Sequence, residues 1–464
     1  MSRPFVAIQV GAVSFVDEGV VPLLDTLQEQ GKINALLLAA HSFDPGTASR
    51  QIKGHPLPDH GVQEYDDLIG GNFATTHKEY YVNTFIKDFE APDYGPNFDI
   101  LAQVLPETKK RGMEVHCWIT EAPNYKLPYL IPNFKAVLEK DVYGRPGPQP
   151  CLNNPDYRNW YLSLYEDYVK SYDIDGLALC SERQGPLGNL LGGGWEQDHI
   201  TCFCSHCRAV GKEKGIDVDR AVRGYQKLIE YFGHAKKGLP LADGFFVTFW
   251  RILLEFPEIL AWEKLFTDSQ FQFYRDLYGT VKAIDPTKKV GWHVQHLNSF
   301  SPFYRATQDY AEYSRFSDYL KIAVYHHCAG PRFARWVRGM HQHVFRDATP
   351  EESVPFLYRM LQIDEAPYEE LAEAGFSADY VRRETERAIQ GTNGKVHIYP
   401  GIGIDVPTMP GEKTSTPEDV EQGVIAAFEG GAQGVILSRK YSEMRLENLR
   451  AAGRAVEAIT RRRG

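Results

Sequence analysis

The stretch "DGLALCSERQGPLG", residues 175–188, decides the fold. It begins with a short apolar run and then turns abruptly polar at Ser181, Glu182 and Arg183. A strand whose successive positions are all apolar needs cover on both faces, which is typical of a parallel sheet. The stretch therefore predicts a buried parallel strand with an acidic side chain just past its carboxyl end.

Seven other segments have the same character, and sequence with a helical pattern separates them. The eight predicted strands are 4–10, 33–40, 114–120, 175–180, 288–294, 317–325, 395–403 and 434–438. Asn154 before Pro155 and Thr416 before Pro417 each mark a helix start. Eight alternating units predict an α/β fold, a (β/α)8 TIM barrel. A doubly wound open sheet is the alternative, although no glycine-rich phosphate loop follows the first strand.

Three connections are longer than a plain barrel turn requires. They span about 41–98, 183–287 and 328–394, and they follow strands 2, 4 and 6. The second contains a long aromatic-rich helical pattern that Pro257 is expected to break in two. We predict that residues 1–464 form a single catalytic barrel with a helical insertion at about 183–287. Long loops at this end of a barrel usually shape a pocket.

The composition limits which binding partners and which cellular compartment we expect for this protein. The net charge is −10, from 51 basic and 61 acidic residues, and the basic tract is confined to residues 461–463. Such a chain is not expected to bind nucleic acid. No apolar run approaches the ~18 residues of a membrane span, and the first strand does not resemble a targeting signal. Seven cysteines do not suggest a disulfide framework, so we expect a cytoplasmic protein; the sequence leaves open whether it forms a homo-oligomer.

The polar residues at the strand ends should meet at one mouth of the barrel. Carboxylates, imidazoles and aromatic rings together suit a small carbohydrate, because rings stack on sugar faces and polar groups bind hydroxyls. The candidate substrate-binding residues are His41, Trp118, Glu121, Arg183, Trp292, His293, His296, Tyr325, His326, Arg439 and Glu443.

Cleavage of an acetal needs an acid and a second carboxylate. Glu182 is the candidate general acid/base, because burial at a strand end could hold its proton near neutral pH. An ion pair with Arg183 at the barrel rim is the structural alternative. Asp405, in "YPGIGIDVP", is the candidate second carboxylate, and a turn-forming role is its alternative.

Cysteines cluster near Glu182 in the sequence. Cys202, Cys204 and Cys207 have C-x-C-x-x-C spacing, and Cys151 opens "CLNNPDYRNW". This arrangement resembles the family 42 β-galactosidases and the hypothetical glycosyl hydrolase families, over residues 148–215. The resemblance implies that Glu182 is the acid/base and that the four cysteines bind a structural zinc. Four thiolates fill a tetrahedral ion, so such a site would be structural. A redox role for Cys204 and Cys207 is the alternative.

Three functions follow from these residues. The first is a glycoside hydrolase that uses Glu182 and Asp405 and needs no organic cofactor. The second is a metal-dependent sugar isomerase, epimerase or lyase, with His293, His296 and His326 as additional ligands. The third is a sugar-binding barrel whose catalysis has degraded, since Ser181 stands where the family has an asparagine.

Overall fold

Eight parallel strands close into a barrel in the computed structural model, which describes residues 3–87, 89–121, 126–192 and 200–463. Each strand pairs with its neighbours along the chain, and β1 pairs with both β2 and β11 to close the ring. The (β/α)8 TIM barrel is thereby confirmed. The barrel strands are β1 (Phe5–Gly11), β2 (Ala35–Ser42), β4 (Glu114–Glu121), β7 (Gly176–Ser181), β8 (Lys289–Val294), β9 (Tyr319–Ala323), β10 (His397–Gly403) and β11 (Gly434–Ser438).

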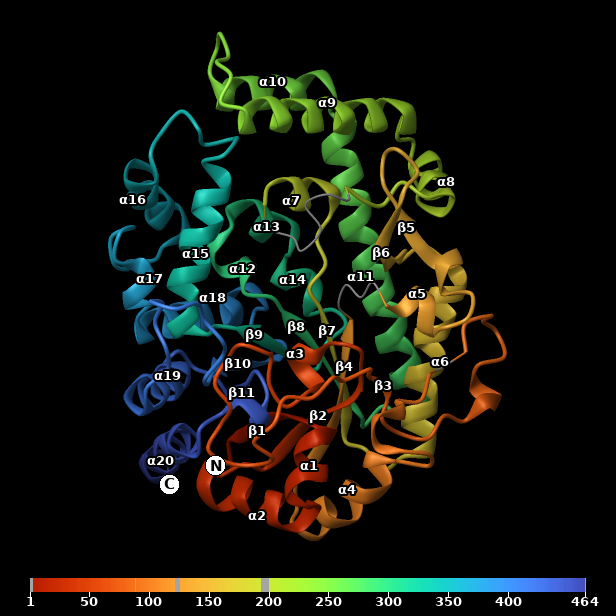
Figure 1. Ribbon diagram of the computed structural model, residues 1–464, viewed down its shortest axis with the longest axis vertical. Helices are drawn as coiled ribbons and strands as arrows, with labels where there is room; N and C mark the ends of the chain where they lie inside the picture. The colour runs from red at the N-terminus through yellow and green to blue at the C-terminus, as the bar shows by residue number, and fades with distance from the viewer. Residues whose placement is uncertain (1–2, 88, 122–125, 193–199, 464) are drawn as a thin grey trace.

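Helices surround the barrel, as the ribbon in Figure 1 shows. Two of the predicted helix starts are confirmed: Asn154 caps the helix that begins at Pro155, and Thr416 forms a capping box with Asp419. The main outer helices are α2 (Val20–Gly31), α4 (Ile100–Lys110), α6 (Pro155–Ser171), α11 (Glu258–Ile284), α15 (His326–Met340), α18 (Ala378–Gly391), α19 (Pro417–Glu429) and α20 (Leu446–Arg463). Short helices fill other connections: α1 (Ala12–Glu18), α5 (Leu127–Leu130), α12 (Leu297–Phe300), α13 (Pro302–Thr307), α14 (Tyr310–Tyr313), η3 (Phe134–Val137) and η4 (Tyr441–Glu443).

The three long connections carry additional elements. Helices α9 and α10 lie at the end of the molecule farthest from the termini in Figure 1, and Pro257 separates α10 from α11 as expected. Residues 193–199 of the second connection lie outside the described residues. The added elements are α3 (Pro45–Ala48), β3 (Gly71–Asn72), η1 (Lys78–Tyr80), η2 (Pro92–Tyr94), α7 (Pro186–Leu190), α8 (Ser205–Glu213), α9 (Val218–Lys236), α10 (Phe245–Glu255), α16 (Pro350–Leu361) and α17 (Leu371–Ala374).

A small hairpin was not predicted from the sequence. Strands β5 (Leu138–Lys140) and β6 (Pro146–Pro150) pair antiparallel before α6. Prolines occupy three of the five positions of β6, and such residues argue against a strand when sequence is the only guide. Among the described residues, no helix is both long and apolar enough to cross a membrane.

Candidate active site

Alternate residues of each barrel strand face the interior, and this alternation sorts the candidate residues into two groups. Inside the barrel, a buried cluster contains Trp118, Ala178 and Cys180. Glu182 continues the same side of β7, because it lies two residues beyond Cys180. Ser181 and Arg183, on either side of Glu182 in the sequence, therefore point the other way, towards the surrounding helices.

Glu182 is a partly exposed carboxylate at the interior end of β7. Its side chain is 35% exposed, and Oε1 lies 3.2 Å from Nε2 of His293. His293 extends from β8 and is buried. The structure therefore brings together two of the predicted site residues, the acid candidate and one histidine.

Lys321 extends this contact deeper into the barrel. Strand pairing places it directly opposite His293 on β9. Its Nζ lies 3.4 Å from Nδ1 of His293, donates a 2.8 Å hydrogen bond to Oη of Tyr325, and sits 4.8 Å from the ring centre of Trp118. An ionised carboxylate can only accept, so Nε2–H of His293 donates to Glu182, and Nδ1 accepts from Lys321.

These contacts determine the charge of the site. Burial raises the pKa of Glu182, but the His293 hydrogen bond and the charges of Arg332 and Lys321 outweigh burial and lower this pKa to about 2. Burial lowers the pKa of His293 to about 4, with the Lys321 charge acting in the same direction. Glu182 is thus ionised and His293 neutral at pH 7. The expectation that burial would keep Glu182 protonated is wrong, because the neighbouring cations stabilise its charged form.

Glu121 and Arg183 lie outside the barrel, under α6. Arg183 is buried, its Nε lies 3.5 Å from Glu121, and Nη2 donates to the carbonyl oxygen of Pro150. Glu121 accepts hydrogen bonds from the hydroxyls of Tyr157 and Ser181. Arg183 pairs with Glu121 and not with Glu182, so the proposed rim pair does not form. A role for Glu121 or Arg183 in substrate binding stays a prediction.

His41 and Trp292 also face the helices. A bulge in β2 shifts the register just before His41, whose ring packs edge-on against Trp160. Trp292 stacks on Tyr274 of α11 at 4.6 Å, and its Nε1 donates to the carbonyl oxygen of Phe316. Both side chains contribute to packing outside the barrel, whereas Trp118 lies inside it beside Lys321.

Of the two remaining candidate histidines, one lies near the barrel interior and the other packs among the outer helices. His296 is buried, and its Nδ1 lies 3.2 Å from Nη1 of Arg332. His326 starts α15 but packs against α19, where a Cβ at Gly423 would lie 2.8 Å from its ring. The structure brings His296 close to Tyr325, with ring centres 5.6 Å apart, but turns His326 away from the interior.

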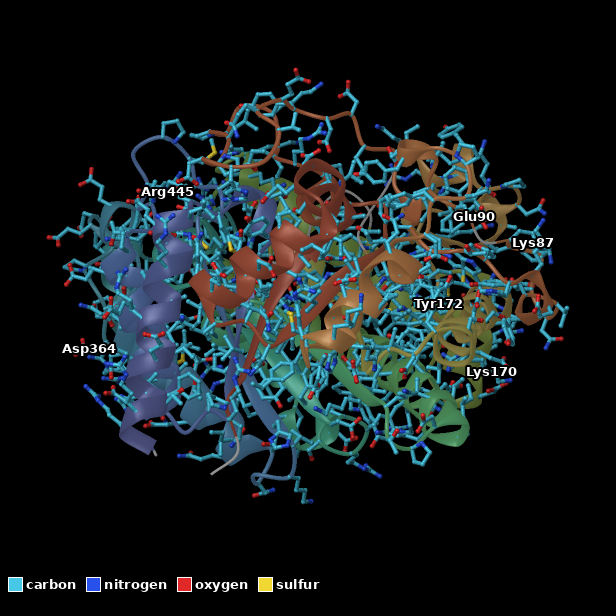
Figure 2. All side chains as sticks on the ribbon, turned by 90° about the horizontal axis from the view of Figure 1, so that it is seen from below. Lys87, Glu90, Lys170, Tyr172, Asp364 and Arg445 are labelled. Carbon is cyan, nitrogen blue, oxygen red and sulfur yellow. The ribbon has the colours of Figure 1, made fainter. Side chains whose placement is uncertain are left out.

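Asp405 is bound by the chain segment that begins α20. Its carboxylate accepts from the backbone N–H of Arg445 at 2.8 Å, from the Arg445 side chain at 3.0 Å and from Nδ2 of Asn448 at 2.9 Å. Figure 2 shows Arg445 near the periphery of the molecule, beside the C-terminal helices. These contacts satisfy the carboxylate and support a structural role. Asp405 also has a left-handed backbone conformation, with φ of 50°.

Arg439 and Glu443 bind each other past β11. Nη2 of Arg439 lies 2.9 Å from Oε2 of Glu443, and Nε lies 3.1 Å from Oε1. The charge of each group is therefore compensated by the other.

The four predicted zinc ligands lie together. The Sγ atoms of Cys151, Cys202, Cys204 and Cys207 are all within 4.8 Å of one another, and all four residues are buried. Asn153 donates from its backbone N–H to Cys151 and from Nδ2 to Cys207, so the sulfur atoms also have hydrogen-bond donors. Four sulfur donors at this separation fit the tetrahedral coordination of zinc.

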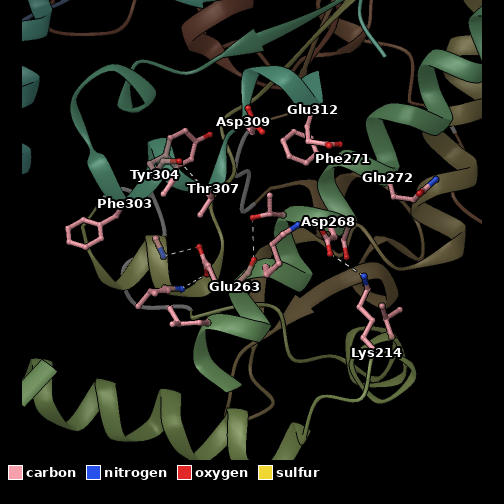
Figure 3. Close-up of a pocket in the computed structure, with 18 of the residues that line it drawn as sticks. Lys214, Glu263, Asp268, Phe271, Gln272, Phe303, Tyr304, Thr307, Asp309 and Glu312 are labelled. Atoms are coloured by element: carbon pink, nitrogen blue, oxygen red, sulfur yellow. Dashed lines mark hydrogen bonds and ion pairs between the residues drawn. The ribbon is translucent and has the colours of Figure 1, made fainter. Parts of the chain in front are cut away.

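A large cavity lies outside the barrel, next to α11. It measures about 1170 Å³, and Figure 3 shows Glu263, Asp268 and Tyr304 among its lining residues. Burial raises the pKa of Glu263 to about 7, although its carboxylate accepts N–H groups from the start of α7. Glu182, His293 and Lys321 do not line this cavity. Because these three residues lie elsewhere, we do not assign the reaction site to this cavity.

Sequence reasoning missed three residues of the interior site: Cys180, Lys321 and Arg332. For Lys321 the available signal was a lysine in the apolar run "SDYLKIAVY", because a lysine is rarely buried in a strand unless it has a specific partner or role. Cys180 shares the side of β7 that carries Glu182. Arg332 lies on α15, well past the strand end, and sequence offered no indication that it returns to the mouth.

No protein-family model matches the sequence, and no curated protein matches it significantly. The fold is similar to solved structures. The glycoside hydrolase domain of PgaB (BpsB) from Bordetella bronchiseptica has a TM-score of 0.53 and 13% identity, with 99% of this chain and 98% of that chain covered. The β-galactosidase from Marinomonas ef1 has a TM-score of 0.52 and 10% identity, with 99% and 60% covered.

A third similar structure is α-L-fucosidase isoenzyme 2 from Paenibacillus thiaminolyticus. Its TM-score is 0.50 at 13% identity, and 99% of this chain is covered. This chain spans about half of the fucosidase, 49%, so that protein has parts with no counterpart here. At these identities the likeness shows a shared barrel fold, of the kind found in glycoside hydrolases.

Proposed function

We propose that the protein is a glycoside hydrolase that cleaves a small glycoside or oligosaccharide at the mouth of its barrel. The observation that carries the proposal is Glu182, a partly exposed carboxylate beside His293 at the interior end of β7. Trp118 and Tyr325 provide aromatic surfaces within the same interior. The likeness of the barrel to those of glycoside hydrolases supports this choice of reaction.

Glu182 would act in its ionised form. Its pKa of about 2 leaves a carboxylate that can attack the anomeric carbon, activate water or stabilise an oxocarbenium-like transition state. The acid/base role implied by the family resemblance requires a proton that the free site does not hold. We therefore place Glu182 as nucleophile or base, and the leaving-group oxygen must be protonated by another group.

Asp405 remains the candidate for a second carboxylate. Its contacts with Arg445 and Asn448 support structural work more directly. If Asp405 is catalytic, the turnover of Asp405→Asn should fall by more than the fraction of folded protein does. In that case a carboxylate separation of ~5–5.5 Å would give retention of configuration, and ~6.5–9.5 Å would give inversion.

The test is Glu182→Gln assayed with a panel of nitrophenyl glycosides. Glutamine keeps the shape and removes the charge, so we expect kcat to fall by about 10²–10⁴-fold with an unchanged circular dichroism spectrum. Glu373→Gln, an exposed residue on α17, is the matched control and should retain full activity. A Glu182→Gln enzyme with wild-type turnover would remove Glu182 from the mechanism.

We also propose that Cys151, Cys202, Cys204 and Cys207 hold a structural zinc, as in the family 42 β-galactosidases that the cysteine spacing resembles. The close, buried sulfur atoms support this assignment. Zinc so bound would have no open coordination position and would tie the loop before α6 to the start of α8.

A metal-dependent sugar isomerase, epimerase or lyase is the second candidate. One observation favours it: Cys180, Glu182 and His293 offer donor atoms that all lie within 4.8 Å of one another. The nearby charges of Lys321 and Arg332 oppose a divalent cation there. Loss of turnover after chelation, with the four-cysteine zinc still present, would favour this reaction class over the hydrolase. Binding of a glycoside with no product of either kind would favour a sugar-binding barrel.

A further inference from the structure

Two basic side chains lie near Glu182 without a carboxylate partner among the described residues. They are Lys321, buried on β9, and Arg332, half-buried on α15. The charges of both lower the pKa of Glu182, so both lie within electrostatic reach of its carboxylate. Arg332 is a permanent cation, whereas burial lowers the pKa of Lys321 to about 7, so that Lys321 is only partly charged at pH 7.

Three other acidic groups that end or follow barrel strands have ion-pair partners. Glu443 pairs with Arg439 at 2.9 Å, Asp405 with Arg445 at 3.0 Å and Glu121 with Arg183 at 3.5 Å. Burial also lowers the pKa of His293 and of His296, so neither imidazole changes the balance at pH 7. Asp44 is a further acidic group whose charge acts on Cys180 and Arg439. Arg332 is therefore distinguished by its lack of a carboxylate partner among the described residues, and not by an overall excess of positive charge.

Arg332 has the geometry to receive an anion. Its Nη1 donates to Nδ1 of His296, and its guanidinium carbon lies 5.9 Å from the ring centre of Tyr325. That hydrogen bond uses one of five N–H donors and goes to a neutral imidazole. A guanidinium fork that is partly desolvated pairs strongly with the two oxygens of a carboxylate or phosphate.

We propose that the ligand of this mouth is an anionic sugar, such as a uronic acid, whose acidic group binds the Arg332 guanidinium. The inference rests on the location of the proposed active site but not on its turnover. The ligand's anion would give Arg332 the direct partner that no carboxylate of the described residues provides. A neutral sugar would leave the half-buried Arg332 guanidinium without an anionic partner, which is unfavourable.

The test is calorimetric titration of the full chain with glucuronate and galacturonate, with glucose and galactose as neutral counterparts. We expect each uronate to bind at least about tenfold more tightly than its neutral counterpart, and less tightly as salt is added. Titration with glucose 6-phosphate tests whether the site prefers a phosphorylated sugar to a uronate. Equal binding of charged and neutral sugars, or binding of none, would overturn the inference.

Arg332→Met separates this role from general effects. It removes the charge while keeping an unbranched side chain, and we expect the preference for anionic sugars to disappear. Arg338→Met, an exposed position on the same helix, should keep the preference. A preference that survives in Arg332→Met would contradict the assignment of Arg332.

The failure of this inference and that of the proposed hydrolase can be told apart. Cleavage of neutral nitrophenyl glycosides but not of the corresponding glucuronides would overturn the anionic ligand and keep the hydrolase. Arg332-dependent binding of uronates, with no glycoside or glucuronide cleaved, would keep the anionic ligand and remove the hydrolase.

Discussion

Lys321 is an ionisable residue in the barrel interior, where burial disfavours its charged form. Burial lowers its pKa to about 7, although the charge of Glu182 acts in the opposite direction. Its hydrogen bonds to Tyr325 and His293 satisfy the amine without removing the cost of burying an ion. The side chain orients His293, which in turn donates to Glu182.

This cost predicts a pH dependence of stability. Between the folded pKa near 7 and the unfolded value near 10.5, the unfolded chain binds more protons, so the free energy of unfolding rises with pH. We expect this rise to be steeper in the wild type than in Lys321→Met, by up to ~1.4 kcal/mol per pH unit.

Urea denaturation at pH 6, 7.5 and 9 measures the difference. The exposed Lys395→Met variant is the control and should follow the wild type. Parallel pH dependences for the wild type and Lys321→Met would show that Lys321 keeps an ordinary pKa.

Asp405 illustrates a carboxylate whose position depends on a left-handed backbone. Asparagine tolerates that conformation, so Asp405→Asn changes the charge with little added strain. We expect the free energy of unfolding to fall by about 1–3 kcal/mol, because the pairing with Arg445 and Asn448 is impaired. Thermal and urea denaturation measure this, and unchanged stability would argue against the structural role.

At the scale of elements, strands β7, β8 and β9 form the side of the barrel that carries the proposed chemistry. Their register aligns Leu179 with Trp292 and His293 with Lys321. Register partners on neighbouring strands share a face, so His293 and Lys321 both face the interior, and Glu182 follows two residues beyond Cys180 on the same side of β7. The Glu182–His293–Lys321 contact is therefore a property of three paired strands.

Helix α19 offers a test of local stabilisation. Thr416 Oγ1 accepts from the backbone N–H of Asp419, and the Asp419 carboxylate accepts from the N–H of Thr416. Thr416→Ala removes one half of this capping box, so we expect a loss of about 1 kcal/mol in the free energy of unfolding. The measurement is the midpoint of urea denaturation, compared between variants whose free energy of unfolding depends equally steeply on urea concentration. Thr414 is exposed and does not cap the helix, so Thr414→Ala is the control. An equal loss of stability in Thr414→Ala would show that the capping box is not the cause.

At the scale of the whole molecule, the cysteine cluster connects distant parts of the chain. Cys151 precedes α6, whereas Cys202, Cys204 and Cys207 belong to the insertion that begins after β7. Trp262 of α11 donates to the carbonyl oxygen of Cys202, so the cluster also contacts the longest helix. A metal at this point would fasten the insertion to the barrel.

The prediction is that purified protein contains about one zinc per chain and loses it in Cys204→Ser. Loss of the ion should lower the melting temperature, because binding to the folded state stabilises it. Metal analysis and calorimetry provide the measurements. Cys117→Ala, in β4 and outside the cluster, should retain the zinc; wild-type protein without zinc under metal-replete expression would contradict the assignment.

The sequence alone determined the barrel, because eight apolar segments separated by helices have few ways to bury both faces of a sheet. It also identified Glu182 and the clustered cysteines, whose signals are local. It could not determine which strand-end residues share the interior: the bulge in β2 turns His41 outward, and Glu121 pairs with Arg183 under α6. Only the tertiary structure decided the protonation of Glu182, because Lys321 and Arg332 come from other elements and charge acts through space.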